Sequence, residues 1–288
     1  MVLSPNERQA AVRIENDPSV WIADLERGTL QRLPDDETPL ETIVLFFSQD
    51  GQRIAYSSRY EDGRAEVVWR AIDGSGDREV LATLGTGTPL FNVRAAVLTP
   101  DGNQMLVTGG STSTDPNLGL DVGVIDMGEP ESYRALVTSP SAEYGARASP
   151  DGRWIAFGSN ESGTLEVYVE RFPEGSGRQP VTISGGVLPL WTADGGRLIY
   201  FDVEAGQRMM RLSVSGFDDT SGSLSFGPPE ELFPWRYYFQ VGVRSQYDVT
   251  ADGERFLVIG QTTGAVASGR MILVQNWFEE LERIVPAD

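Results

Sequence analysis

A short pattern of apolar and polar residues occurs six times along the chain. Its clearest copy is ASPDGRWIAFGSN at residues 148–160, where a short strand ends in Ser149, a Pro-Asp-Gly turn follows, and residues 153–157 alternate with period two. Glycine supplies a positive φ in such a turn and Asp bonds its own backbone, so each copy predicts a β-hairpin. The other copies lie at residues 2–14, 46–58, 97–109, 190–202 and 248–260.

Two more strands follow the hairpin where the repeat is clearest. Residues 161–172 carry a loop and a third strand, and residues 173–183 carry a Gly-Ser-Gly loop and a short fourth strand. Four antiparallel strands per repeat are typical of a propeller blade. The turns are 44, 51, 50, 43 and 58 residues apart, close to the about 40 to 50 residues of propeller repeats. We therefore predict an all-β fold, a six-bladed β-propeller of four-stranded antiparallel blades, with residues 1–288 as a single domain.

The wider gaps between turns locate insertions at residues 110–119 and 217–243, and the polar, glycine-rich stretch 218–227 is predicted to be a surface insertion. Residues 276–286, NWFEELERIVP, predict a short amphipathic C-terminal helix that packs on the last blade. The first repeat lacks a full leading strand and the last lacks a fourth. We therefore expect that ring closure uses a strand upstream of Met1 in a longer natural chain.

The net charge of the chain argues against two classes of binding partner, nucleic acids and anionic membranes. The formal net charge is −19, which repels nucleic-acid phosphates and anionic lipid. No stretch approaches the roughly 18 apolar residues of a membrane-spanning helix, so we expect no membrane insertion by this segment. Every basic residue is Arg, and either codon bias or adaptation to salt explains the absence of Lys.

Two missing residue types limit the chemistry. The chain has neither Cys nor His. The absence of both excludes disulfides, thiolate nucleophiles, Ser-His-Asp triads and His-ligated metals. Any catalysis would depend on carboxylates, Tyr, Ser or a carboxylate-bound metal, and we expect a protein without catalytic residues.

The segments SPDGRWIAF, NESGTLEVYVERFP, GGVLPLWTADGGRLIYF and YDVTADGERFLVIG together resemble TolB-like propellers built from PD40 repeats. The ending ILVQNWFEELERIVP resembles the C-terminus of propeller regions fused to bacterial serine/threonine protein kinases. This resemblance implies a sensor module outside the cytoplasm, in the periplasm or beyond a transmembrane helix. It supplies no catalytic residues. Separately, we expect the protein to be a monomer.

Two sets of residues are candidates for function. The turn aspartates are expected to be structural turn formers rather than a calcium-binding ring, since they are spread around the ring; they are Asp50, Asp101, Asp151, Asp194 and Asp252. The densest aromatic cluster is the candidate binding site for a ligand or partner, because Trp, Tyr and Arg dominate binding hot spots. It consists of Trp235, Arg236, Tyr237, Tyr238 and Phe239.

Three functions stay open at this point. The leading hypothesis is a non-catalytic module that binds a protein or small-molecule ligand and needs no cofactor. The second is a propeller hydrolase of the lactonase or esterase type with carboxylates around a central calcium. The third is an accessory propeller of a partner peptidase.

Overall fold

The computed structural model describes residues 1–14, 17–34, 39–62, 65–84, 92–110, 120–137, 139–203, 207–218, 222–234 and 247–258. Every regular element in these ranges is a β-strand, and none of the described residues forms a helix able to cross a membrane. The predicted all-β class is therefore confirmed. The predicted helix at 276–286 lies outside the described residues.

Five antiparallel sheets follow one another along the chain, and each is one blade. The first blade contains β1 (Val2–Leu3), β2 (Gln9–Arg13), β3 (Val20–Asp24) and β4 (Thr29–Arg32). The second contains β5 (Glu41–Phe47), β6 (Arg53–Arg59), β7 (Ala65–Ala71) and β8 (Glu79–Leu84). The third contains β9 (Asn92–Leu98), β10 (Gln104–Gly110), β11 (Leu120–Asp126) and β12 (Glu129–Val137).

The fourth blade contains β13 (Glu143–Ala148), β14 (Trp154–Ser159), β15 (Glu166–Arg171) and β16 (Ser176–Pro180). The fifth contains β17 (Val187–Trp191), β18 (Arg197–Asp202), β19 (Arg208–Asp218), β20 (Ser223–Phe226) and β21 (Glu230–Pro234). Within the described residues, a last sheet has two strands, β22 (Tyr247–Val249) and β23 (Phe256–Val258). We call this pair the sixth hairpin.

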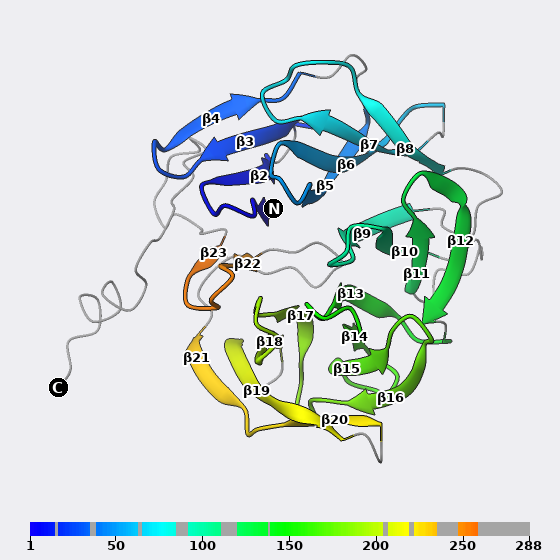
Figure 1. The fold of residues 1–288 in the computed structure, drawn as a ribbon, viewed down its shortest axis with the longest axis vertical. Helices are drawn as coiled ribbons and strands as arrows, with labels where there is room; N and C mark the ends of the chain where they lie inside the picture. Colours follow the sequence, from blue (N-terminus) through cyan, green and yellow to red (C-terminus); the bar gives the residue numbers. More distant parts are fainter. Residues whose placement is uncertain are drawn as a thin grey trace.

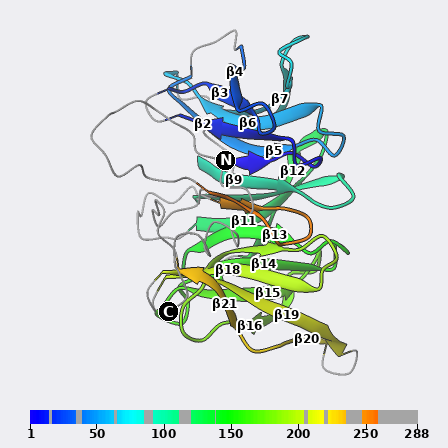
Figure 2. The ribbon, with the colours of Figure 1, turned by 90° about the vertical axis from the view of Figure 1, so that its left-hand side faces the viewer.

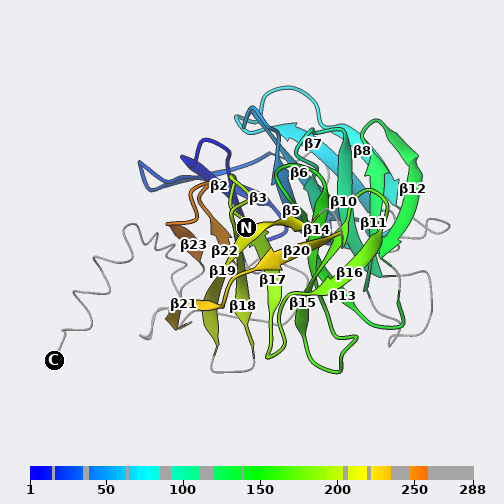
Figure 3. The same cartoon turned by 60° about the horizontal axis from the view of Figure 1, so that its bottom comes forward.

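The sheets are arranged in a ring with their first strands innermost (Figure 1). Each inner strand contacts the next, from β1 to β5, β9, β13 and β17, and β22 contacts β1. The sixth hairpin lies between the fifth blade and the first, where the orange strands meet the blue ones in Figures 1 and 3. From the side, Figure 2 shows the sheets edge-on and stacked one after another.

The blade count differs from the prediction. Within the described residues there are five blades of four or five strands, not six, and the sixth repeat contributes only the two strands of its hairpin. The sixth repeat has turn residues like those of the other copies, and local hydrogen bonds are enough to form its hairpin. A third and a fourth strand would have to come from residues that follow the hairpin in the sequence. That stretch begins at residue 259, beyond the described ranges.

The predicted insertion at 217–243 is partly wrong. Strand β19 is 11 residues long, which is enough to pair with β21 along its first half and with β20 along its second. Residues 223–226, assigned from their polarity to a surface insertion, therefore form an edge strand. Leu224 anchors this strand because its side chain is buried in the apolar cluster between the fourth and fifth blades.

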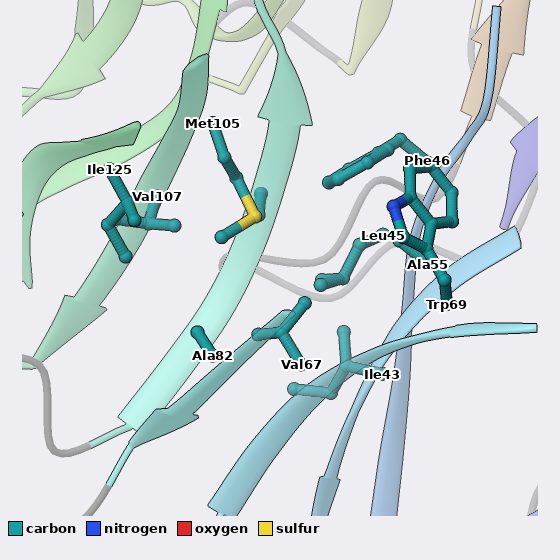
Figure 4. Close-up of a cluster of buried hydrophobic side chains, with 11 residues drawn as sticks. Ile43, Leu45, Phe46, Ala55, Val67, Trp69, Ala82, Met105, Val107 and Ile125 are labelled. Atoms are coloured by element: carbon teal, nitrogen blue, oxygen red, sulfur yellow. The ribbon is translucent and has the colours of Figure 1, made fainter. Parts of the chain in front are cut away.

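Apolar side chains fill the seams between blades. At the seam between the second and third blades, Phe46 and Trp69 of the second blade meet edge to face with ring centroids 5.2 Å apart, and Met105 and Val107 of the third blade lie across the cluster from them (Figure 4). Between the third and fourth blades, Phe157 stacks on Tyr168 at 6.1 Å. Each blade thus shelters the apolar face of its neighbour, as closure of a propeller requires.

The six turns share one bonding pattern at one end of the ring. In the fourth blade the Ser149 hydroxyl donates to Asp151 Oδ1 (2.5 Å), which also accepts the backbone N–H of Arg153 (3.1 Å). The same hydroxyl-to-side-chain bond recurs at 2.5–2.8 Å in Ser48–Asp50, Thr99–Asp101, Thr192–Asp194, Thr250–Asp252 and, with an amide, Ser4–Asn6. The bonds from Ser or Thr hold the pKa of the carboxyls of Asp50, Asp101, Asp194 and Asp252 below the usual value.

Candidate functional site

Two charged residues occupy inner-strand positions that are apolar elsewhere. The position two residues before the turn Ser or Thr holds Arg147 in β13 and Asp248 in β22. In the other four repeats the same position holds Val2, Phe46, Val97 and Leu190. A charge at a core position of a repeat is costly unless it is paired or used, so these two residues mark the centre of the ring as a candidate site.

The two charges interact across the ring. Arg147 belongs to the fourth blade and Asp248 to the sixth hairpin, with the fifth blade between them in the chain. Burial raises the pKa of Asp248, and the backbone N–H groups of Leu3 and Val249 and the positive charge of Arg147 oppose that rise. Burial likewise lowers the pKa of Arg147, and the Asp248 carboxylate opposes that effect. Both side chains are half-buried, so each retains contact with solvent.

Hydrogen bonds from both neighbours fix these strands. The backbone N–H of Leu3 donates to Asp248 Oδ2 (2.7 Å), which joins the first blade to the sixth hairpin. Trp191 Nε1 donates to the Arg147 carbonyl (3.2 Å), which joins the fifth blade to the fourth. We name Arg147, Trp191, Tyr247 and Asp248 the axial set.

Tyr247 completes the set and holds a strained backbone. Its side chain is buried, and its hydroxyl donates to the Leu188 carbonyl (2.5 Å). Leu188 has φ of 56° at the bulge of β17, a conformation that costs a non-glycine residue of order 1–3 kcal/mol and often marks functional sites. Burial raises the pKa of Tyr247, so its phenol stays neutral and remains a donor.

The axial set offers a guanidinium, a carboxylate and an indole on three different inner strands. This combination can bind a ligand that carries complementary charges or hydrogen-bonding groups. Within the described ranges no three acidic side chains lie close enough together to hold a metal ion.

The predicted aromatic binding site lies in a part of the chain that the structure does not describe. Trp235, Arg236, Tyr237, Tyr238 and Phe239 all lie outside the described residues. Their flanks are described: Pro234 ends β21 opposite the start of β19, and Tyr247 begins β22. Both flanks lie at the ends of strands away from the turns.

The sequence contains a signal for two members of the axial set, although our sequence analysis did not identify them. Aligning the six repeats on the turn Ser or Thr shows Arg147 and Asp248 as charged exceptions in an apolar column. Residue composition drew attention to the aromatic cluster instead. What the alignment does not give is the pairing of the two exceptions, because this depends on how the ring closes.

No family model matches the chain. The chain is similar to a protein assigned as a TolB from Agrobacterium tumefaciens, at 19% identity and a TM-score of 0.60, covering 80% of this chain and 78% of that one. It is similar to TolB from Acinetobacter baumannii at 18% identity and a TM-score of 0.61, covering 88% of this chain and 58% of that one, so it spans less than two thirds of that protein. An oligogalacturonate lyase in complex with manganese matches at 12% identity and a TM-score of 0.60, covering 90% of this chain and 69% of that one. At these identities the likeness shows the fold alone, and the fold is a TolB-like β-propeller.

Proposed function

We propose that the protein is a non-catalytic binding module that holds a protein or small-molecule ligand at the centre of its ring. The observation that carries this proposal is the axial pair of Arg147 and Asp248, two charged residues on the inner strands β13 and β22 at otherwise apolar repeat positions, whose charges act on each other. The TolB neighbours support a binding role for the fold.

The aromatic segment is a second part of the proposed surface. In the sequence, residues 235–239 follow Pro234, the last residue of β21, and Tyr247, next to Asp248, begins β22. We propose that these aromatic and arginine side chains contact the same ligand as the axial set. The wider setting, an extracytoplasmic sensor region of a receptor-type kinase or a similar envelope protein, rests on the sequence resemblance alone.

The test compares the ligands retained by the wild-type chain with those retained by Arg147→Gln and Asp248→Asn. The matched control is Arg153→Gln, because Arg153 is an exposed arginine at the turns whose ion pair is with Asp151 of its own turn. Envelope extract is passed over each immobilised protein, and retained species are quantified by mass spectrometry. We expect at least one species that both axial variants lose and the control keeps. If the three variants and the wild type retain the same species, the central site is wrong.

The enzyme alternative has its own observation, the likeness in fold to an oligogalacturonate lyase in complex with manganese. It is tested on the same purified chain by metal analysis and by assays with lactone, ester and oligogalacturonate substrates, with calcium and with manganese. Turnover that exceeds background and depends on the metal would replace the binding proposal. Assays that stay at background in both metals would leave the enzyme alternative without support.

A further inference from the structure

One buried carboxyl far from the turns is not satisfied by its own fold. Glu143, the first residue of β13, is completely buried. Its Oε1 accepts a hydrogen bond from the Ser139 hydroxyl (2.6 Å), but its Oε2 has no hydrogen-bond partner among the described residues. Buried polar atoms are almost always paired, so an unpaired carboxyl oxygen calls for an explanation.

A second carboxyl comes to the same place from the neighbouring blade. Ser139 uses its hydroxyl for Glu143 and its backbone N–H for Asp121 of β11. The two carboxyls therefore lie on either side of one residue in the linker from the third blade to the fourth. Asp121 and Ser139 are both partly exposed, so solvent is one side chain away from Glu143.

The charges around Glu143 do not compensate it. Among the described residues, Asp121 and Glu161 both oppose its ionisation, and Arg178 favours it. Arg178 is already engaged in ion pairs with Glu161 and with Glu170 (3.5 Å). An ionised Glu143 would therefore lack a positive charge to compensate it.

The hydrogen-bonding capacity that remains at the Glu143 carboxyl determines which kind of cation fits the site. Oε1 of Glu143 already accepts a hydrogen bond, and Oε2 is the oxygen without a partner among the described residues, so the forked, two-point bond that a guanidinium makes to a carboxylate is not available. A compact ammonium makes single-point bonds and can bridge Oε2 and Asp121. The chain contains no Lys, so such a side chain has to come from another molecule.

We propose that Glu143 and Asp121 form a binding site for an organic primary ammonium at the seam between the third and fourth blades. Binding transfers the proton of the Glu143 carboxylic acid to solvent and leaves a carboxylate paired with the ammonium. The site is separate from the axial set, and it goes beyond the function proposed above.

Proton release makes the binding depend on pH. Burial raises the pKa of Glu143 to about 7, so below that pH the proton competes with the ligand. With one proton released, the dissociation constant at about pH 6 is expected to be about tenfold higher than at about pH 8. The ammonium itself stays charged over this range.

The experiment titrates butylammonium into the full chain by calorimetry at about pH 6 and about pH 8, in buffers of different ionisation enthalpy that count released protons. Butanol and tetramethylammonium are the matched ligands, the first without charge and the second without N–H donors. We expect saturable binding of butylammonium alone, the tenfold pH effect, and release of a proton at the lower pH.

The variants separate the site from the general acidity of the surface. Glu143→Gln is expected to abolish the pH effect and proton release, and Asp121→Asn to weaken binding, while the exposed control Glu174→Gln leaves both unchanged. Melting curves verify that each variant folds. The proposal is overturned if butylammonium does not saturate, if tetramethylammonium binds equally well, or if Glu143→Gln retains the pH effect.

Discussion

At the scale of single residues, the turns depend on a carboxylate that accepts two local hydrogen bonds. Asp151 accepts from the Ser149 hydroxyl and from the Arg153 backbone, and Ser149 in turn accepts the Trp154 N–H (3.0 Å). The first repeat makes the same bonds with the neutral amide of Asn6. The geometry of the acceptor, rather than its charge, is therefore what the turn requires.

This comparison predicts the outcome of two substitutions at one position. Asp151→Ala removes both bonds, together with the exposed ion pair between Arg153 Nε and Asp151 Oδ2 (2.7 Å), and is expected to lower the free energy of unfolding by about 1–2 kcal/mol. Asp151→Asn keeps an acceptor in place, as Asn6 does, and is expected to cost less than half as much. Urea denaturation monitored by tryptophan fluorescence measures both. Equal losses would show that the charge is what matters.

Glu143 gives a pH dependence of the opposite sign to that of the turn aspartates. Its folded pKa of about 7 lies above the ordinary value of 4.5, so its contribution to stability is fully present below pH 4.5 and is lost as the pH rises to about 7. The difference corresponds to about 3 kcal/mol. The turn aspartates have lowered pKa values and titrate below this window.

We therefore expect the stability of the wild-type chain to fall between about pH 4.5 and about pH 7, and that of Glu143→Gln to be flatter. Denaturant titrations across this range provide the measurement, with Glu174→Gln as the exposed control. A wild-type curve as flat as the Glu143→Gln curve would contradict the prediction.

At the scale of elements, the turn of the first blade differs from the other turns in its Glu7, which contacts the turn of the sixth hairpin. Glu7 occupies the place where the other copies have glycine, and it has φ of 60°. Its carboxylate accepts the Ala251 N–H (2.8 Å) and pairs with Arg255 (2.5 Å), both on the turn of the sixth hairpin. Backbone strain at Glu7 is thus compensated by a contact that closes the ring.

Two substitutions separate the strain from the contact. Glu7→Ala loses the contact and keeps the strain, and is expected to destabilise the chain by about 1–2 kcal/mol. Glu7→Gly loses the same contact but adopts a positive φ without penalty, and is expected to be more stable than Glu7→Ala by about 1 kcal/mol. Thermal denaturation of the two variants measures the difference. Identical midpoints would mean that φ at residue 7 stores no strain.

Local elements were predictable because their causes are local. The hairpins follow from the turn residues and the alternating strands, as in residues 148–160, and the third and fourth strands follow from the same period. Strand β20 was missed because its pairing depends on the unusual length of β19 and not on its own polar residues. The axial pairing of Arg147 with Asp248 was not predictable, because it joins repeats that are far apart in sequence.

At the scale of the whole molecule, the sixth hairpin is joined to the ring by contacts on both of its flanks. Among the described residues it has two strands where the blades have four or five. On one side the Tyr247 hydroxyl bonds Leu188 and the Ala193 N–H donates to Ala251 (2.9 Å). On the other, Glu7 holds the turn.

This arrangement predicts that the ring opens first at the sixth hairpin. Tyr247→Phe removes one buried hydrogen bond and leaves the Leu188 carbonyl unpaired, a loss of about 1–2 kcal/mol. Opening of β22 and β23 should then become roughly 5- to 30-fold more frequent, while β14 and β15 in the fourth blade keep their protection. Hydrogen exchange resolved by peptide measures both regions in one experiment. Because the fourth blade is a complete sheet with neighbours on both sides, a uniform rise in exchange across all blades would mean that the ring unfolds as one unit.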